Sequence, residues 1–419
     1  MHILKSIQIY GFRNQEAPIE LRLSKNANFL IGRNGTGKTT LINLVHAALT
    51  VDVEVLREIS FDKIEFRFSR KGSRKIPHIS VLQRDYDGLE RQIDYTIRTF
   101  AGDQVRKFNL TSPQRRVVIS EHGRRIVTSR PNRTSLKEIL RSVFSVTWLS
   151  LQRGGDLFSD DEEIQEQDST DVDRKLEQVT VALSGYLSRL DKEVTAQTQT
   201  FQKNWFLSFL ISGPRSTHVS MNRINLSAEK ETLKEIFEKF DVDSEQYEQK
   251  IETHFNIAER IVSTSKPSLT DLFHITDITR LHDLVVQWQD LQKLQKETYK
   301  PKLQFTAVAS AMLYRKTIVI NTSNRLEVMS DSGVSVPPKK LSSGEKQLLI
   351  FLSEALLQEG RPYIFLADEP ELSLHVEWQE ELVPSLLKLN PSAQVLFATH
   401  SPDIVSVFQE NVFEMEKLS

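Results

Sequence analysis

The residues with the clearest chemical meaning lie between an apolar run at Phe29–Ile31 and a helix-like run that begins at Leu41. They match the pattern G-x-x-x-x-G-K-[ST], in which glycines let backbone N–H groups and a helix N-terminus surround a phosphate. The lysine of this pattern adds positive charge near the β- and γ-phosphates, and the hydroxyl takes a place on Mg²⁺. We therefore predict a site for a nucleoside triphosphate. Its residues are Asn34, Gly35, Thr36, Gly37, Lys38, Thr39 and Thr40.

Polar residues also follow apolar runs near the C-terminal end of the sequence. Tyr363–Ala367 is apolar throughout, as in a buried parallel strand, and it leads directly into Asp368 and Glu369. A carboxylate at such a strand end can hold Mg²⁺, and the next one can polarise a water molecule for attack on the γ-phosphate. A second apolar run, Val395–Ala398, leads to His400. We expect this histidine at the same edge of the sheet.

A third motif precedes a long apolar helix predicted over Leu348–Leu357. It reads Leu-Ser-Ser-Gly-Glu-Lys-Gln over residues 341–347. A serine at a helix start caps free N–H groups, and the helix dipole there favours an anion. These two facts alone are also satisfied by a simple helix cap.

The elements around these motifs indicate an α/β fold with a helical insertion. Alternating residues predict antiparallel strands, and the spacing of Leu176, Val179, Leu183, Tyr186 and Leu190 predicts a coiled-coil-like seam. Further helical pattern is predicted over residues 228–261 and 268–298, and a return to strands over 305–308 and 317–320. The predicted early strands cover residues 3–10, 19–23, 29–31, 64–68, 79–82, 93–97, 117–119 and 144–149.

Composition indicates a globular chain with two charged blocks. The 419 residues are 39% hydrophobic and include no cysteine, which excludes disulfides and thiolate sites. No apolar run of about 18 residues and no signal peptide is present, so we expect a cytoplasmic protein without a membrane partner. Residues 63–133 are rich in Arg and Lys, and residues 156–173 are rich in Asp and Glu. These blocks indicate partners of opposite charge, or else solvated strand faces and a flexible loop.

The four motifs in this order resemble the ATP-binding-cassette (ABC) ATPases of the SMC, RecF and OLD type, whose head domain is split by a coiled-coil or helical insertion. The resemblance covers about residues 1–155 and 300–419. It implies an ABC-type head with a mixed P-loop sheet and an antiparallel β-subdomain. The implied domains are 1–155 for the first half of the head with its basic β-subdomain, 156–300 for the helical arm and 301–419 for the second half of the head.

The resemblance also implies a role for each matching residue, with ATP and Mg²⁺ as cofactors. Glu369 is implied as the catalytic carboxylate, His400 as the switch histidine, and Thr39 and Asp368 as metal-binding residues. Gln152 stands where a metal-binding glutamine is expected, although an ordinary surface glutamine fits that place equally well. Arg13 matches an arginine set against the nucleotide, with a plain surface charge as the alternative. The signature residues, which complete the site of a partner head, are Ser342, Gly344 and Glu345, and Ser373 lies in the D-loop.

The motifs around Asp368 and His400 look closest to the OLD-like branch found in anti-phage systems. Only nineteen residues follow His400, so we expect no TOPRIM nuclease domain in this chain. The organisation is similar to the stand-alone ATPase subunits of Septu, PARIS and some retrons. The resemblance thus implies a head-to-tail dimer or higher homo-oligomer that regulates a separately encoded nuclease effector. The basic region 63–133 is a candidate site for DNA or for an acidic phage protein. A RecF-like DNA-repair ATPase and a nucleotide-stabilised scaffold are the alternatives.

Overall fold

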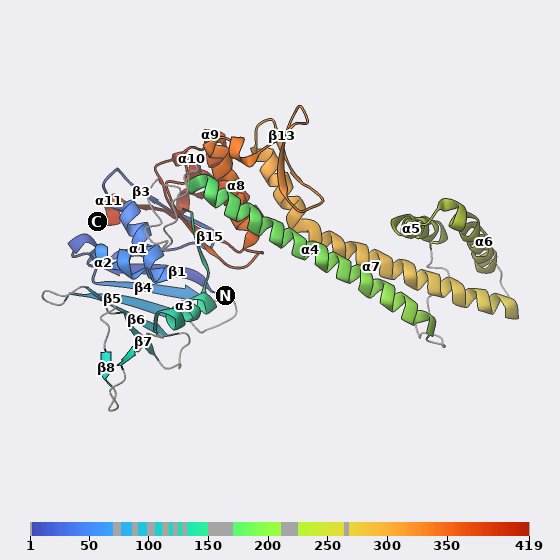
Figure 1. Cartoon of the computed structure of the whole chain (residues 1–419), viewed down its shortest axis with the longest axis horizontal. Coiled ribbons are helices and arrows are strands. Elements are labelled where there is room, and N and C mark those ends of the chain that lie inside the picture. The colour runs from blue at the N-terminus through green and yellow to red at the C-terminus, as the bar shows by residue number, and fades with distance from the viewer. Residues whose placement is uncertain are drawn as a thin grey trace. The chain divides into compact units, whose positions relative to one another are not determined.

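The computed structural model of the chain describes residues 2–69, 77–85, 91–98, 105–110, 117–119, 125–127, 132–149, 171–210, 225–263 and 268–418 (Figure 1). The chain forms two compact units. The first unit, called the head below, comprises Met1–Gly185 and Gln304–Ser419, and the second, called the helical unit, comprises Tyr186–Leu303. The predicted domain boundaries at residues 155 and 300 stay a prediction.

A five-stranded parallel sheet lies at the centre of the head. Its strand order is β10-β14-β15-β3-β16, and every neighbouring pair runs parallel. All residues of β14 and β15 are buried, which explains why both read as continuous apolar runs. Because the strands are parallel, the loops that follow β3, β14 and β15 meet at one edge of the sheet. The strands are β3 (Ala27–Ile31), β10 (Val146–Leu149), β14 (Ile364–Asp368), β15 (Gln394–Ala398) and β16 (Val412–Glu414).

A six-stranded antiparallel sheet shares the core of the head, with strand order β2-β1-β4-β5-β6-β7. Its inner face packs toward α1 (Lys38–Thr50), and the Tyr95 hydroxyl donates to the Ala48 carbonyl at 2.9 Å. Figure 1 shows α1 above these strands. The strands are β1 (Ile3–Tyr10), β2 (Ile19–Arg22), β4 (Lys63–Ser69), β5 (His78–Arg84), β6 (Gln92–Arg98) and β7 (Arg106–Leu110). The smaller elements nearby in sequence are α2 (Val53–Glu58), β8 (Val117–Ile119), β9 (Arg125–Val127) and α3 (Asn132–Val143).

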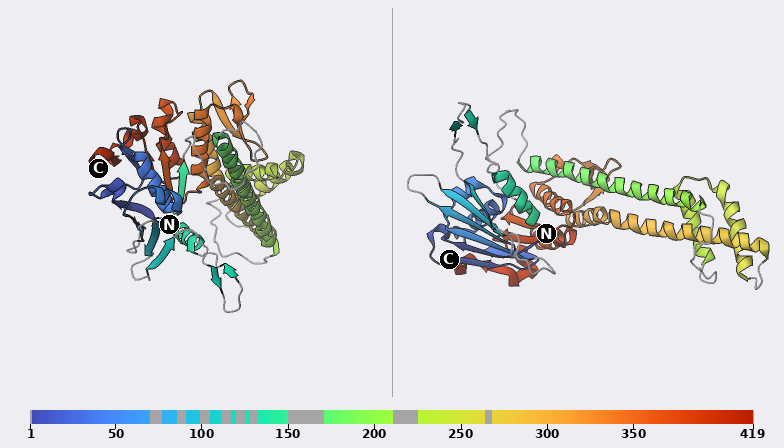
Figure 2. Two further views of the ribbon diagram at one scale, coloured as in Figure 1. Left: turned by 60° about the vertical axis from the view of Figure 1, so that its left-hand side comes forward. Right: turned by 90° about the horizontal axis from the view of Figure 1, so that it is seen from below.

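Two long antiparallel helices form the frame of the helical unit, as both views in Figure 2 show. Residues from α4 (Asp171–Leu210) and α7 (Leu269–Met312) are joined by hydrogen bonds from Gln197 to Thr298 and from Tyr299 to Asp191. The five seam residues predicted on α4 are all buried. The helical stretch predicted over 228–261 is two helices, α5 (Leu226–Lys239) and α6 (Ser244–Ser263), because the chain turns at Asp241 with φ of 54°.

The strand predicted over residues 305–308 is wrong, since these residues lie in the last turns of α7. Phe305, Val308, Ala309 and Met312 are buried, and their spacing of three, one and three residues is that of a helix face. Pro301 is accommodated inside the helix. The predicted strand over 317–320 is confirmed as β11 (Lys316–Ile320), which pairs with β12 (Leu326–Ser330), and β12 pairs with β13 (Ser335–Val336).

The remaining helices belong to the second half of the head. They are α8 (Ser343–Leu357), α9 (Val376–Leu389), α10 (Pro402–Val405) and α11 (Met415–Leu418). The predicted fold class is confirmed: a P-loop follows a strand of a parallel sheet, an antiparallel sheet accompanies it, and a long helical insertion separates the two halves of the head. Within the described part of the chain, no helix is both long and apolar enough to cross a membrane.

Candidate ATP site

The phosphate-binding loop runs from the end of β3 to the first residue of α1. The buried Lys38 ammonium donates to the carbonyls of Gly32 at 2.7 Å and Arg33 at 3.1 Å. Gly37 has φ of 95°, a conformation that side-chain-bearing residues rarely adopt. Burial lowers the pKa of Lys38, while the charges of Glu369 and Asp368 oppose that shift. The loop therefore holds a lysine ammonium next to carboxylates at the edge of the parallel sheet.

Arg13 lies against this loop. Its Nη1 donates to the Gly35 carbonyl at 3.3 Å, so the structure brings Arg13 to the loop as the resemblance implied. The Arg13 backbone N–H donates to the Ser60 carbonyl at 3.0 Å, and the Ser60 hydroxyl donates to the Asn14 side chain at 3.0 Å. Both bonds tie the turn that carries Arg13 to the segment between α2 and β4.

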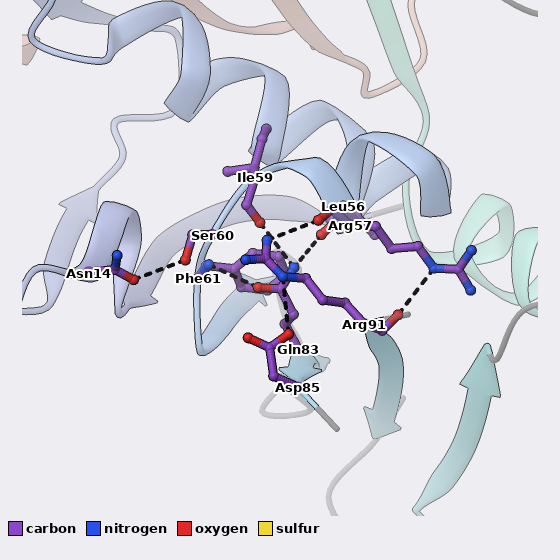
Figure 3. Close-up of polar contacts among 9 residues, drawn as sticks. All are labelled: Asn14, Leu56, Arg57, Ile59, Ser60, Phe61, Gln83, Asp85 and Arg91. Atoms are coloured by element: carbon purple, nitrogen blue, oxygen red, sulfur yellow. Dashed lines mark hydrogen bonds and ion pairs between the residues drawn. The ribbon is translucent and has the colours of Figure 1, made fainter. Parts of the chain in front are cut away.

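That segment is held in turn by Gln83 of β5 (Figure 3). Its amide nitrogen donates to the carbonyls of Leu56 at 2.6 Å and Ile59 at 3.0 Å, and its amide oxygen accepts from the Phe61 N–H at 3.2 Å. The Gln83 side chain thus bonds three backbone groups, one in the last turn of α2 and two in the segment that follows it. The antiparallel sheet thereby fixes the place of Arg13 beside the P-loop.

Thr39 and Asp368 meet although 329 positions separate them in sequence. The Thr39 hydroxyl donates to the Asp368 carboxylate at 3.2 Å. Burial raises the pKa of Asp368 against the hydrogen bond from Thr39, and the charges of Glu369 and Glu371 raise it further. A carboxylate that is costly to ionise and lies beside a hydroxyl is a suitable half-site for a cation.

This donor set fits Mg²⁺ that is shared with a nucleotide. Mg²⁺ usually binds one or two protein groups and completes its shell with water and phosphate oxygens. Among the described residues, no cluster of three or more His, Asp or Glu side chains could hold a metal without such help. Thr39 and Asp368 would hold the ion, and the ion would neutralise charge on the transferring phosphoryl group.

Glu369 and His400 lie next to one another at the same sheet edge. His400 Nε2 is 3.8 Å from the Glu369 carboxylate, and the Glu369 N–H donates to the Ala398 carbonyl at 2.8 Å. Glu369 has φ of 47°, a strained conformation for a residue with a side chain. Glu371, which was not predicted as a site residue, accepts from the His400 N–H at 2.7 Å. The signal that could have identified Glu371 is the motif Asp-Glu-Pro-Glu, in which it follows Glu369 by two residues.

The predicted serine cap at the start of α8 is confirmed. Ser342 is the N-cap of α8, and its hydroxyl accepts from the Glu345 N–H at 3.3 Å, while the Glu345 carboxylate accepts from the Ser342 N–H at 2.9 Å. Lys316 of β11 also pairs with Glu345. Burial favours a higher pKa for Glu345, but the hydrogen bonds from Lys316 and Ser342 outweigh it and lower the pKa. The ionised Glu345 thus holds this turn in place through its bonds to Ser342 and Lys316.

Gly344 is required by a close approach of the loop that carries Ser373. A Cβ on Gly344 would lie 2.2 Å from the Ser373 carbonyl oxygen. The Gln347 amide donates to the Pro370 carbonyl at 3.0 Å, which ties the same loop to α8. The structure therefore brings Gly344 and Ser373 together within one chain. Their roles toward a partner head stay a prediction.

Three further residues complete the placement of the predicted site. Asn34 is exposed, Thr40 is partly buried in the first turn of α1, and Gln152 lies outside the described residues.

Sequence reasoning missed Glu416, whose carboxylate accepts from the Arg33 N–H at 2.7 Å. This hydrogen bond lowers the pKa of Glu416. Glu416 follows β16, a strand of three residues that was not predicted.

Comparison with known proteins finds a relative and two solved structures to which the chain is similar. Over 132 residues the chain is 31% identical to the cell division ATP-binding protein FtsE of Mycobacterium tuberculosis, covering 30% of this chain and 55% of FtsE. The chain thus spans about half the length of that relative. Smc head domains of Pyrococcus furiosus and Pyrococcus yayanosii align over 97% of this chain and over 91% and 93% of theirs. Their sequence identities are 11% and 13%, and their TM-scores are 0.41 and 0.39.

Two protein-family models match. The first covers residues 271–406 and is described as an AAA domain, with a suggested AbiEii toxin of a type IV TA system. The second is described as an AAA domain and covers residues 4–309, which is more than half of the chain and includes the P-loop. With its P-loop set at the edge of a parallel sheet, this chain therefore belongs to the AAA domain family.

Proposed function

We propose that the head binds Mg²⁺-ATP and hydrolyses it as a conformational switch. Membership in the AAA domain family implies the use of nucleotide and Mg²⁺. The observation that carries the proposal is the hydrogen bond between Thr39 and Asp368, because it joins the two halves of a metal site from opposite ends of the chain. Lys38 would bind the β- and γ-phosphates, Glu369 would orient the attacking water, and His400 would lie beside them.

The proposed site is composite, so two heads are needed for turnover. Ser342, Gly344 and Glu345 of one head would face the ATP of another, in a head-to-tail dimer or a higher homo-oligomer. The contact between Gly344 and Ser373 supports this proposal, because it joins the signature turn to the loop after Asp368 as one surface. ATP binding would then close two heads and hydrolysis would release them.

A mixing experiment tests the composite site. Ser342→Arg should bind ATP without turning it over, and Lys38→Ala should bind ATP more weakly. A mixture of the two variants contains hybrid dimers with one intact site, and we expect ATPase activity there that neither variant shows alone. The control is Ser332→Arg, an exposed serine between β12 and β13. No gain on mixing, with both variants folded, would show that each head works by itself.

We propose further that the switch controls a separately encoded nuclease effector in bacterial anti-phage defence. The motifs Asp368–His375 and Thr399–Pro402, which resemble those of the OLD-like branch, support this role. The match over residues 271–406 to a model described with a toxin–antitoxin system is also in keeping with it. In this proposal the ATPase holds or releases the effector according to its nucleotide state.

The effector is tested by purification of the tagged chain from its native host with the neighbouring genes present. Mass spectrometry and the native mass of the complex are the readouts. A stoichiometric nuclease on a dimer or ring of this chain is the expected result. Recovery of the ATPase alone, or with DNA and repair factors, would replace this proposal with the repair ATPase.

One observation favours the RecF-like alternative as a second candidate. On the outer face of the antiparallel sheet, cross-strand neighbours form a row of Arg22, Ser6, Arg67, His78 and Arg98. Cationic side chains along such a row could neutralise successive phosphates of DNA. Glu20 and Glu65 in the adjacent row reduce the net charge, and part of the predicted basic region lies outside the described residues.

Binding of gapped DNA tests this second candidate. If the row binds DNA, Arg67→Glu and Arg98→Glu should each weaken binding at low salt and reduce the slope of log affinity against log salt by about one. Lys203→Glu, on the exposed surface of α4, is the matched charge control. Equal affinities of all three variants for gapped DNA would show that this face does not bind DNA.

A further inference from the structure

Two loops meet at the edge of the parallel sheet where the proposed ATP site lies, one after β14 and one after β15. Glu371 in the first loop accepts from the His400 backbone N–H at 2.7 Å. Gln379 of α9 accepts through its amide oxygen from the Ser401 hydroxyl at 2.6 Å. Two consecutive residues of the second loop are therefore held by side chains from the segment that follows β14.

The loop that carries Glu371 is itself fixed by hydrogen bonds. Its Pro370 carbonyl accepts from the Gln347 amide of α8 at 3.0 Å. The Leu374 N–H donates to the Glu371 carbonyl at 2.9 Å, and the Leu374 carbonyl accepts from the Gln379 amide nitrogen at 2.9 Å. Side chains that are locked by such surrounding bonds can set the geometry of a functional residue. The Glu371 carboxylate therefore offers a rigid acceptor to the second loop.

The bond to Glu371 fixes the backbone of His400 between two anchored neighbours. Thr399, the residue before it, donates its N–H to a carbonyl of β3 at 3.0 Å. Ser401, the residue after it, is the N-cap of α10. With its backbone held in this way, His400 places its ring Nε2 3.8 Å from the Glu369 carboxylate. Loss of the bond would leave the His400 backbone free to turn and the ring free to move away from Glu369.

One oxygen of the Glu371 carboxylate is costly to the fold. Oε2 is shielded from solvent and has no hydrogen-bond partner among the residues that the structure describes. A buried acceptor without a donor destabilises a protein, and in native structures such a group calls for a functional explanation. A carboxylate forms a hydrogen bond about twice as strong as that of a neutral acceptor. The stronger bond to the His400 N–H is an advantage that would offset this cost.

The charge of Glu371 also reaches the phosphate-binding loop. Burial lowers the pKa of Lys38 and raises the pKa of Asp368, and the charge of Glu371 raises the pKa of both groups. Glu371 could therefore act through its charge or through its hydrogen bond. The direct contact is with the His400 backbone, and the two effects can be separated because glutamine keeps an acceptor oxygen but carries no charge.

We propose that Glu371 is a positioning residue of the ATPase site, which fixes the His400 backbone so that the ring stays beside Glu369. This inference rests on the proposed function and deepens it. Glu369 keeps the role of orienting the attacking water, and Glu371 contributes through His400. Loss of the bond should slow the chemical step and leave ATP binding intact, because Lys38 and the backbone of the P-loop keep their places.

Amide hydrogen exchange of the full chain without nucleotide tests the bond itself. Glu371→Ala should speed exchange at the His400 amide by at least about tenfold, because its acceptor is lost. The amides of Glu369 and Thr399 donate to carbonyls of the parallel sheet, and their unchanged protection should report that the fold is intact. Glu371→Gln should lie between Glu371→Ala and the wild type. Unchanged exchange at His400 in Glu371→Ala would overturn the inference.

ATPase and ATP-binding assays test the role of the bond. Glu371→Ala should lower kcat by about 10- to 100-fold, the range typical when a partner that orients a site residue is removed. The Kd for ATP should change by less than about twofold. Glu371→Gln should recover most of the lost rate, and Glu377→Ala, at an exposed position in the first turn of α9, is the matched control with the wild-type rate. If Glu371→Gln were as slow as Glu371→Ala although its His400 amide stayed protected, the charge would matter instead of the hydrogen bond, and the positioning role would be wrong.

A double variant shows whether Glu371 acts through His400. His400→Ala removes the ring but keeps the N–H, so the addition of Glu371→Ala to it should lower kcat by less than about twofold further. Independent losses that multiply in the double variant would overturn the inference. An inactive wild type would instead overturn the proposed ATPase, whereas an active wild type together with an equally active Glu371→Ala would overturn the positioning role alone.

Discussion

The head and the helical unit use polar side chains in different ways. In the head, polar groups from distant parts of the sequence converge on one loop, as Thr39 does with Asp368 and Arg33 with Glu416. In the helical unit, the hydrogen bonds of Tyr299 with Asp191 and of Gln197 with Thr298 run between α4 and α7, and aromatic side chains line a cavity. The difference teaches that the phosphate-binding loop and the helical unit can be altered separately by substitution.

The largest expected effect is that of Lys38→Ala in the head. The lysine charge faces the phosphates in the proposed site, and its loss should lower kcat/KM for ATP by about 10⁴-fold, on the scale known for cations that face a transferring phosphoryl group. Steady-state ATPase assays measure this change. Lys203→Ala on α4 is the control and should leave the rate unchanged. An active Lys38→Ala enzyme would break the assignment of catalysis to the P-loop.

Glu369→Gln should lower kcat by about 10³-fold while ATP remains bound, because the amide is a poor acceptor for a water proton. Single-turnover kinetics and nucleotide-binding assays separate the two effects. The control is Glu377→Gln, an exposed carboxylate in the first turn of α9. Normal turnover in Glu369→Gln would falsify its catalytic role and would direct attention to Glu371.

The stability of the head should depend on pH through His46. This residue of α1 stacks on Trp148 with ring centroids 4.6 Å apart, and burial lowers its pKa to about 4. Between pH 6.5 and 4 the unfolded chain binds more protons at this residue than the folded chain does. The free energy of unfolding should therefore decrease as the pH is lowered from 6.5 to 4, by up to about 3 kcal/mol. Denaturant titrations across this range measure the loss. His46→Gln should flatten the dependence, and an unchanged profile would contradict it.

The smallest effect concerns the helical unit. Tyr299→Phe removes the 2.9 Å hydrogen bond to Asp191 and should destabilise the packing of α4 on α7 by about 1 kcal/mol, without a change in ATPase activity. Amide hydrogen exchange along both helices is the measurement. Tyr314→Phe is the control, because Tyr314 is 73% exposed in the head. A lower ATPase rate in Tyr299→Phe but not in Tyr314→Phe would contradict this expectation, because it would show that the packing of α4 on α7 affects the head.

The local sequence pattern was enough to predict most strands and the order of the motifs. The buried runs that became β14 and β15 were readable because strands covered on both faces are apolar throughout. The strand predicted over 305–308 failed because a short run of Phe, Thr, Ala and Val fits either period, and only the burial of Ala309 and Met312 revealed the helix. The break at Asp241 between α5 and α6 carries no glycine or proline to announce it.

By itself, the sequence determined the phosphate-binding pattern, the carboxylates after a buried strand and the serine cap of α8, because each depends on neighbours within a few residues. Only the tertiary structure decided that Thr39 bonds Asp368, that Glu416 reaches Arg33, that the Ser373 carbonyl excludes a side chain at Gly344, and that aromatic residues of the helical unit line a cavity. These contacts depend on strand order and helix packing, which bring together residues far apart in sequence and which no local pattern records.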